Sequence, residues 1–262
     1  MCGRYILVQK VETIEKRFNV IAPIGLLWKA SYNISPGQMA PVITSEHPKY
    51  LDLMQFGMTP FWAKKQMYLM NARAEGDRNR ENNPQYSGAK DIISKPAFRK
   101  PIRSQRCLVI ADAFIEGSTN EGLDNPFMVY LRNQERPFAF AGLFDEWKDI
   151  KSGNIIKSFS IITTTSNELM LKIPHHRMPV ILDRNQEQVW LNKSTPLSRI
   201  TKMLRAFPYN LMNAYPISSS IKNPKNNTEN LVQPLGERLM MESDIQQNDE
   251  IHLQGMGRYK HP

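Results

Sequence analysis

The sequence predicts one α+β domain, built on a curved and mainly antiparallel β-sheet or a barrel-like pair of sheets, with short helices around it. Three observations predict this fold class. Most apolar segments are short and rich in β-branched and aromatic residues, as strands are. The helical segments are short and lack the regular crossovers of a doubly wound parallel fold. The 18 prolines are spread over 262 residues, which favours many loops and argues against a long coiled coil.

The expected elements follow from local patterns along the chain. In the segment 166–173, Ser166 is the expected helix N-cap, and Leu169 and Met170 are expected to face inward. Apolar residues at helical spacing predict a short helix over 11–20, another over 166–173 and a helical turn over 187–193. Strands are expected at residues 4–9, 41–44, 106–117, 125–132, 137–147, 157–165 and 178–183, and residues 50–62 are expected to form a strand that leads into a turn at Pro60.

We assign residues 1–235 to the domain and residues 236–262 to a C-terminal extension. The extension is polar and lacks sustained periodicity, so we expect an appended helix or a partly disordered segment. A chain of this length can bury enough surface to fold without disulfides or a structural metal. No internal repeat is visible.

The composition favours an anionic partner, because the net charge is +9 and the pI is about 9.5. Nucleic acid is the first candidate for that partner. No apolar run is long enough to span a membrane, and the N-terminus lacks the pattern of a secretory signal. We therefore expect a cytoplasmic, nucleoid-associated protein. The only cysteines are Cys2 and Cys107. Cys107 lies in a strand-like segment and is expected to be a buried apolar residue.

Cys2 is the strongest candidate for chemistry. Removal of Met1 would place an α-amine and a thiol on one residue, and both have nucleophilic forms near neutral pH. Such an aminothiol condenses with an aldehyde through its amine, and its thiol then closes a five-membered thiazolidine ring. Alternatively, the thiolate attacks an acyl centre with the α-amine as base. Gly3 lets the backbone turn tightly beside it.

Several polar residues are candidate partners for Cys2. In an extended segment, Asn71, Arg73 and Glu75 would share one face. Glu116 ends an apolar strand, where burial favours acid–base use of its carboxyl group. His175 can exchange a proton near neutral pH. Each signal is weak alone, and their combination is more informative.

A zinc site is weakly supported. Cys2, Cys107, His175 and His176 are possible ligands, but the chain has no CxxC or HxxxH spacing. We therefore expect no metal and no cofactor.

The motifs, taken together, resemble the SRAP family, the SOS-response-associated peptidases, which include bacterial and human sensors of abasic sites in single-stranded DNA. The resemblance covers roughly residues 1–235. It is carried, in order, by MCGRY, YNISPGQMAPVI, FGMTPFW, NARAE, RCLVIADAFIEG, FAFAGLFDEW and IITTTSNELMLKIPHHRMPVIL.

The resemblance implies a role for each candidate. Cys2, freed by loss of Met1, would capture the ring-opened aldehyde of an abasic site as a thiazolidine DNA–protein crosslink that protects the lesion in the DNA-damage (SOS) response. Asn71 would orient the Cys2 backbone or the deoxyribose. Glu116 would assist Met1 removal and proton transfer at the amine, and His175 would help to open the sugar ring.

The resemblance also implies a DNA-binding surface and an expected monomer. Arg4, Arg73 and Arg177 would hold phosphates that flank the lesion. Trp62, with Phe61, would stack on bases or act as a wedge, although core packing explains these two residues equally well.

Three positions depart from the family pattern RCLxPADGFYEW. Ile110 replaces Pro, Ala113 replaces Gly and Gly117 replaces Trp, whereas Glu116 keeps its place. We expect the change at Gly117 to alter packing or the neighbouring groove, and the segment after it to form a different loop.

Two other functions remain open from the sequence. One is a glutamine amidotransferase of the N-terminal nucleophile type, whose members also begin Met-Cys-Gly. However, no segment here resembles their glutamine-binding regions. The other is a non-catalytic binder of single-stranded DNA, which leaves the NARAE and HHRMP motifs without a purpose.

Overall fold

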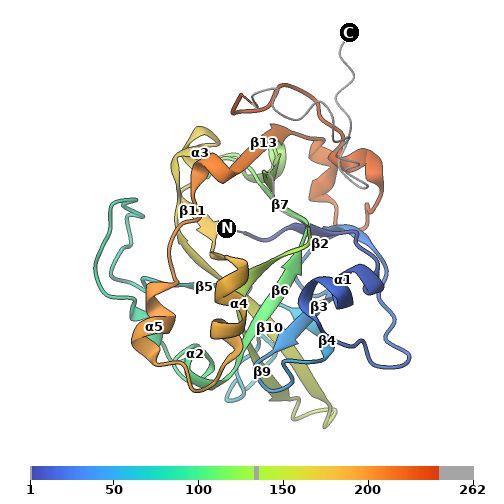
Figure 1. Ribbon diagram of the computed structural model, residues 1–262, viewed down its shortest axis with the longest axis vertical. Coiled ribbons are helices and arrows are strands. Elements are labelled where there is room, and N and C mark those ends of the chain that lie inside the picture. Colours follow the sequence, from blue (N-terminus) through green and yellow to red (C-terminus); the bar gives the residue numbers. More distant parts are fainter. Residues whose placement is uncertain (1, 133–135, 242–262) are drawn as a thin grey trace.

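The computed structural model describes residues 2–132 and 136–241, which form two β-sheets with short helices around them (Figure 1). The first sheet has the strand order β13-β8-β7-β1-β2. Its strands are β1 (Tyr5–Leu7), β2 (Ser31–Ile34), β7 (Ala113–Glu116), β8 (Phe127–Leu131) and β13 (Met212–Pro216). The strand-rich α+β prediction is confirmed.

The second sheet has the order β11-β10-β4-β3-β6-β9-β12, and β5 pairs with β10 beside this path. Its pairings are antiparallel except that β10 runs parallel to β4 and to β5. Its strands are β3 (Met39–Thr44), β4 (Leu51–Phe56), β5 (Asn71–Arg73), β6 (Arg106–Ala111), β9 (Phe138–Lys148), β10 (Ile155–Thr165), β11 (Arg177–Pro179) and β12 (Ile181–Leu182).

The α-helices have at most eight residues and lie on the outside of the sheets. The α-helices are α1 (Val11–Phe18), α2 (Pro101–Ser104), α3 (Glu168–Lys172), α4 (Arg184–Leu191) and α5 (Leu197–Lys202). Single 3-10 turns occur at residues 91–93, 122–124, 209–211, 219–222 and 229–232. Among the described residues, no helix is long and apolar enough to cross a membrane.

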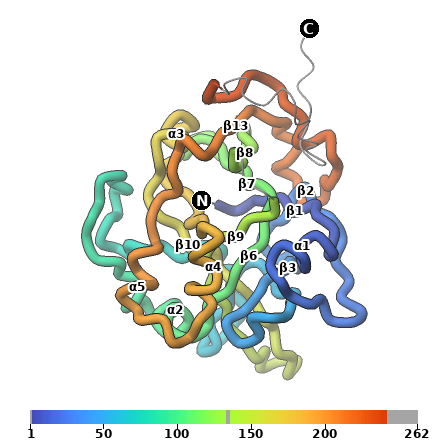
Figure 2. The backbone as a smooth tube through the Cα atoms, in the orientation of Figure 1, coloured from blue at the N-terminus to red at the C-terminus, as the bar shows by residue number. Residues whose placement is uncertain are grey.

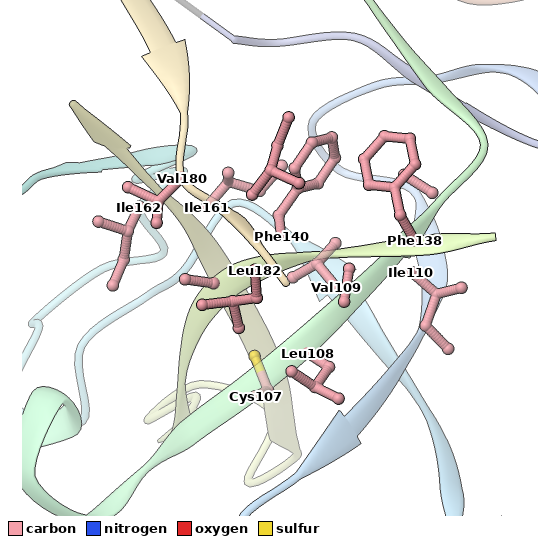
Figure 3. Packing of buried hydrophobic residues seen from close by; sticks show 14 of the residues in the cluster. Cys107, Leu108, Val109, Ile110, Phe138, Phe140, Ile161, Ile162, Val180 and Leu182 are labelled. Carbon is pink, nitrogen blue, oxygen red and sulfur yellow. The ribbon is translucent and has the colours of Figure 1, made fainter. Parts of the chain in front are cut away.

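The core lies where the two sheets face each other. Figure 3 shows its centre, in which side chains from β6, β9, β10 and β12 meet and Cys107 lies fully buried, as expected. The ring of Phe140 makes edge contacts with the rings of Tyr5, Phe114 and Phe138, at centroid distances of 5.3 to 6.0 Å. Aromatic pairs of this geometry add stability beyond the area that they bury.

Strand β1 contributes to two cores, because successive side chains of a strand point to opposite faces. Tyr5 and Leu7 belong to the main core, whereas Ile6 packs into a second cluster on the other face with Met128 and Tyr215. This alternation places the residues before β1 at the boundary between the two sheets.

The chain passes directly from the second sheet to the first at Asp112, between β6 and β7. The amide of Asp112 donates to the carbonyl of Ile6 at 2.7 Å, and its Oδ2 accepts from the amide of Val8 at 2.7 Å. This crossing fixes β7 beside β1 in antiparallel register, with Tyr5 opposite Phe114. As a result, the end of β7 lies next to the start of the chain.

The structure confirms the helix predicted over 166–173 but not its predicted N-cap. The helix predicted over 166–173 exists as α3, and Leu169 and Met170 are buried as expected. The cap prediction was wrong: Asn167 is the N-cap and accepts from the amide of Met170, whereas the Ser166 hydroxyl donates to the carbonyl of His175. Asn167 caps the helix because its Oδ1 accepts a hydrogen bond from the third amide of the first turn.

The start of the C-terminal extension packs against β13. The amide of Leu239 donates to the carbonyl of Ala214 at 2.8 Å, and the amide of Met240 donates to Oδ1 of Asn213 at 3.0 Å. The remainder of the predicted extension, residues 242–262, lies outside the described residues.

Candidate active site around Cys2

Four segments that are distant in the sequence meet beside Cys2. Cys2 precedes β1, Asn71 begins β5, Glu116 ends β7 and His175 lies just before β11. Figure 2 shows the chain entering β1 near the middle of the fold, close to β7. The side chain of Asn71 donates from Nδ2 to the carbonyl oxygen of Cys2 at 3.0 Å. The structure therefore brings together all four residues predicted to carry the chemistry.

Cys2 is only 3 % exposed, and its thiol hydrogen-bonds with Glu116. Burial first, and then the negative charge of Glu116, raise the pKa of the Cys2 thiol well above its usual value. The nearby Arg177 acts in the opposite direction and does not overcome burial. The resting thiol is therefore protonated at neutral pH, and its activation requires a proton acceptor within the site.

Glu116 and His175 form the acceptor pair. Oε2 of Glu116 lies 3.3 Å from Nε2 of His175, and both side chains are almost fully buried. Nδ1 of His175 lies 2.7 Å from the carbonyl oxygen of Gly117. A carbonyl oxygen only accepts, so we assign the proton to Nδ1. Nε2 then faces a carboxyl oxygen, at a distance across which a proton can pass between the two groups.

Burial lowers the pKa of His175, and the attraction of Glu116 only partly offsets this effect. The imidazole is therefore neutral at pH 7 and able to take up a proton. Together, Glu116 and His175 can accept the thiol proton and return it to a leaving oxygen.

Arg177 is held by internal contacts. Its Nη1 donates to Oε2 of Glu75 at 2.8 Å, and its Nη2 donates to the carbonyl of Thr163 at 2.8 Å. Glu75 is fully buried and also accepts from Lys90 at 3.1 Å and from Thr164 at 2.7 Å. Arg177 therefore acts on the site chiefly as a fixed positive charge.

The expectation that Asn71, Arg73 and Glu75 share one face holds only in part. Strand β5 ends at Arg73, and a turn follows, so Glu75 lies beyond the extended segment. Glu75 is buried against Arg177, whereas Asn71 and Arg73 remain partly exposed. The buried ion pair is the physical reason, because a carboxylate at this depth requires a cationic partner.

A cavity of about 410 Å³ opens over these groups. The three predicted phosphate ligands, Arg4, Arg73 and Arg177, contribute to its walls. Arg73 donates to the carbonyl of Asn79 and to Oδ1 of Asn82, and Arg4 donates to the carbonyl of Lys222 at 3.2 Å. The cavity is lined by Gly3, Arg4, Arg73, Asn82, Ile115, Glu116, Gly117, Ser118, Thr119, Gly122, Leu123, His175, His176 and Arg177.

Trp62 does not line this cavity. It is 49 % exposed beside Phe61, whose amide donates to Asp145 at 2.9 Å and whose ring lies under Lys100 at 4.6 Å. The core-packing alternative for Trp62 and Phe61 is therefore wrong, because both rings are about half exposed.

Several residues that support the ion pair of Arg177 and Glu75 or line the cavity were not predicted from the sequence. Thr163 and Thr164 support Arg177 and Glu75, and Ser118, Thr119 and Asn82 line the cavity. They are common polar residues in loops or at a strand end, and no local pattern marks them. Within residues 2–132 and 136–241, no group of three or more His, Cys, Asp or Glu side chains is placed to hold a metal ion.

Comparison with known proteins identifies the family. Residues 1–224 match the family described as SOS response associated peptidase (SRAP). The chain belongs to the SRAP family. This SRAP protein is 35 % identical over 241 residues to "Abasic site processing protein YoqW" of Bacillus subtilis, covering 89 % of this chain and 99 % of that one.

More distant relatives agree with this assignment. The chicken (Gallus gallus) protein "Abasic site processing protein HMCES" is 26 % identical over 243 residues, covering 79 % of this chain and 67 % of that protein. A solved structure from Bacteroides thetaiotaomicron matches this SRAP protein with a TM-score of 0.74 and 27 % identity, covering 89 % of this chain and 99 % of that one.

Proposed function

We propose that this SRAP protein captures abasic sites in single-stranded DNA by forming a covalent bond through Cys2, in the DNA-damage response. The observation that carries the proposal is that buried Cys2 contacts Asn71 and Glu116, and that Glu116 and His175 line an adjoining cavity together with Arg4, Arg73 and Arg177. Relatives named abasic site processing proteins support the same substrate.

The first step is loss of Met1. Water hydrolyses the Met1–Cys2 peptide bond, which releases methionine and leaves Cys2 with a free α-amine. The carboxyl group of Glu116, which hydrogen-bonds the Cys2 thiol, is the acid–base group for this autoproteolytic step. Asn71 holds the carbonyl of Cys2 and thereby fixes the direction of the new N-terminus.

The second step is capture of the sugar. An abasic deoxyribose is in equilibrium between a closed hemiacetal and an open aldehyde. Neutral His175, paired with Glu116, moves the proton that opens the ring. The α-amine attacks C1′ of the aldehyde, and water leaves to form an imine. The Cys2 sulfur then adds to the same carbon, and its proton passes to the imine nitrogen through the Glu116–His175 pair.

The order of attack follows from the resting state of the thiol. Because the pKa of the Cys2 thiol is raised, the amine is the better first nucleophile and the sulfur follows within the closed site. The product is a thiazolidine, which leaves no free aldehyde for strand cleavage. Arg4 and Arg73 hold flanking phosphates, and Arg177 adds positive charge beneath them.

The test is denaturing gel electrophoresis of the protein with single-stranded DNA that carries one abasic site, together with intact-mass analysis. We expect loss of Met1 and a heat-stable band that requires both the abasic site and Cys2. Cys107→Ala is the matched control, because it removes the other cysteine, which is fully buried in the core. If Met1 is absent and no band forms, the proposal is wrong. Turnover of glutamine in a glutaminase assay would then point to the amidotransferase alternative.

A further inference from the structure

The segment Ser118–Asn125, here called the wall loop, forms one side of the Cys2 cavity. It follows β7 directly, and Ser118, Thr119, Gly122 and Leu123 line the cavity on this side. The cavity is otherwise lined by residues next to Cys2, by Arg73 and Asn82, and by the segment 175–177. The wall loop therefore limits the space that a ligand can occupy over Cys2.

Polar contacts connect the wall loop to the residue before His175 and, through Lys222, to Arg4. The amide and the hydroxyl of Thr119 both donate to the carbonyl of Pro174, at 3.0 and 3.1 Å, immediately before His175. On the other side, Asp124 pairs with Lys222, whose carbonyl accepts from Arg4. Displacement of the loop would therefore disturb both His175 and Arg4.

Internal contacts also hold the loop in one shape. The amide of Gly122 donates to the carbonyl of Ser118 at 2.9 Å, and the amide of Glu121 donates to the Ser118 hydroxyl at 3.0 Å. Leu123 packs against the second hydrophobic cluster beneath β7. These contacts define the position of the loop at the cavity.

Because Gly117 has no side chain, the backbone of the wall loop can pack directly against it. A Cβ at Gly117 would overlap the Gly122 carbonyl oxygen and would lie 2.7 Å from the Gly122 carbonyl carbon and 3.2 Å from the Asn125 carbonyl oxygen. These are backbone atoms, so no side-chain rotation can relieve the overlap. Any other residue at position 117 must push the wall loop away from β7.

We propose that the wall loop is the specificity-determining wall of the Cys2 cavity, and that it rejects a nucleotide that still carries its base. This inference rests on the proposed function. In an intact nucleotide the base is attached to C1′, the same carbon that the Cys2 amine and sulfur must reach. Glu116 and His175, which adjoin buried Cys2, line the same cavity as the wall loop, so a base brought to that carbon through the cavity would meet the wall loop.

The test compares the affinities of two unreactive oligonucleotides. One carries tetrahydrofuran, an abasic analogue without an aldehyde, and the other carries thymidine at the same position. We expect the wild-type protein to bind the tetrahydrofuran strand at least about tenfold more tightly, and Gly117→Ala to reduce this ratio to within about twofold. The ratio is unaffected by a uniform loss of active protein.

Two further variants separate selectivity from folding. Gly153 lies in the distant β9–β10 turn with a φ of +76°, which strains an alanine, and nothing lies near the new methyl group of Gly153→Ala. This variant should lower stability and keep the ratio. Thr119→Val removes only the hydroxyl contact with Pro174 and should lower the ratio partly, whereas Thr119→Ser should restore it.

The outcomes distinguish this inference from the proposed function. If wild type crosslinks abasic DNA but shows no preference for tetrahydrofuran, or if Gly117→Ala keeps the preference while folded, the wall loop does not determine specificity. If wild type prefers tetrahydrofuran but forms no crosslink, selection by the wall loop stands and covalent capture is wrong.

Discussion

Nε2 of His175 lies 3.3 Å from Oε2 of Glu116, and both groups are buried beside Cys2. The other ring nitrogen, Nδ1, forms a hydrogen bond with the carbonyl oxygen of Gly117. A proton can therefore pass between the imidazole and the carboxyl group. The fold holds this pair beside the Cys2 thiol, which hydrogen-bonds with Glu116.

His175→Gln is expected to slow crosslink formation about 100-fold, because it removes a general acid–base group. The variant should also change the dependence of stability on pH. Burial lowers the pKa of His175 in the folded protein, so the unfolded chain binds more protons below about pH 6.5. Wild type should therefore lose stability as pH falls from 7 to 5, and the variant should lose less. Thermal melts across this range measure the effect, and parallel curves for the two proteins would contradict it.

Asn71→Asp is expected to slow crosslinking roughly 10- to 100-fold, because the carboxylate cannot donate to the carbonyl of Cys2. The loss of stability should be about 1–3 kcal/mol, because the change removes hydrogen bonds to the carbonyls of Cys2 and Met70 and places a carboxylate beside them. Single-turnover rates with abasic DNA, together with urea unfolding, separate the two effects. Asn83→Asp, a change of the same kind in the neighbouring loop, serves as the control. An unchanged rate in Asn71→Asp would show that this contact does not orient the nucleophile.

Glu75→Gln is expected to destabilise the protein by about 3–5 kcal/mol, because it leaves Arg177 buried without its carboxylate. Although burial alone raises the pKa of Glu75, Arg177, Thr164 and Lys90 together lower it. Its contribution to stability is therefore present above the ordinary pKa of a carboxyl group and is lost as pH falls through the lowered value. Urea unfolding at pH 7 and pH 3 measures both effects. In the double variant Glu75→Gln, Arg177→Met, the loss should be smaller than the sum of the single losses, and strict additivity would contradict the coupling.

Trp62→Ala is expected to weaken non-covalent binding of single-stranded DNA by about 1–3 kcal/mol, the usual value of one base stacked on an aromatic ring. Because Trp62 is half exposed, its removal should leave thermal stability nearly unchanged. Fluorescence anisotropy with a labelled oligonucleotide measures the affinity. Tyr50→Ala is the matched control, because Tyr50 is a similarly exposed aromatic residue immediately before β4. Equal affinities for Trp62→Ala and wild type would remove Trp62 from the DNA-binding surface.

The sequence alone predicted the strand-rich fold class, most strand positions and the three residues that lie around Cys2, namely Asn71, Glu116 and His175. These predictions succeeded because they rest on local periodicity and on motifs whose residue types suit one chemistry. The positions of Cys107, Leu169 and Met170 in the core also follow from local apolar patterns. The catalytic roles of Cys2, Asn71, Glu116 and His175 stay predictions, as do the DNA-binding roles of Arg4, Arg73, Arg177 and Trp62.

Only the tertiary structure decided which groups contact each other in the site. Asn71 and the carbonyl of Cys2 are 69 positions apart, and Glu75 and Arg177 are 102 positions apart. Neither contact leaves a local signal, because each depends on how β5, β10 and β11 are paired. The wall loop has the same origin: Gly117 is recognisable as a departure in the sequence, but the carbonyl of Gly122 that requires it is placed by the folded backbone.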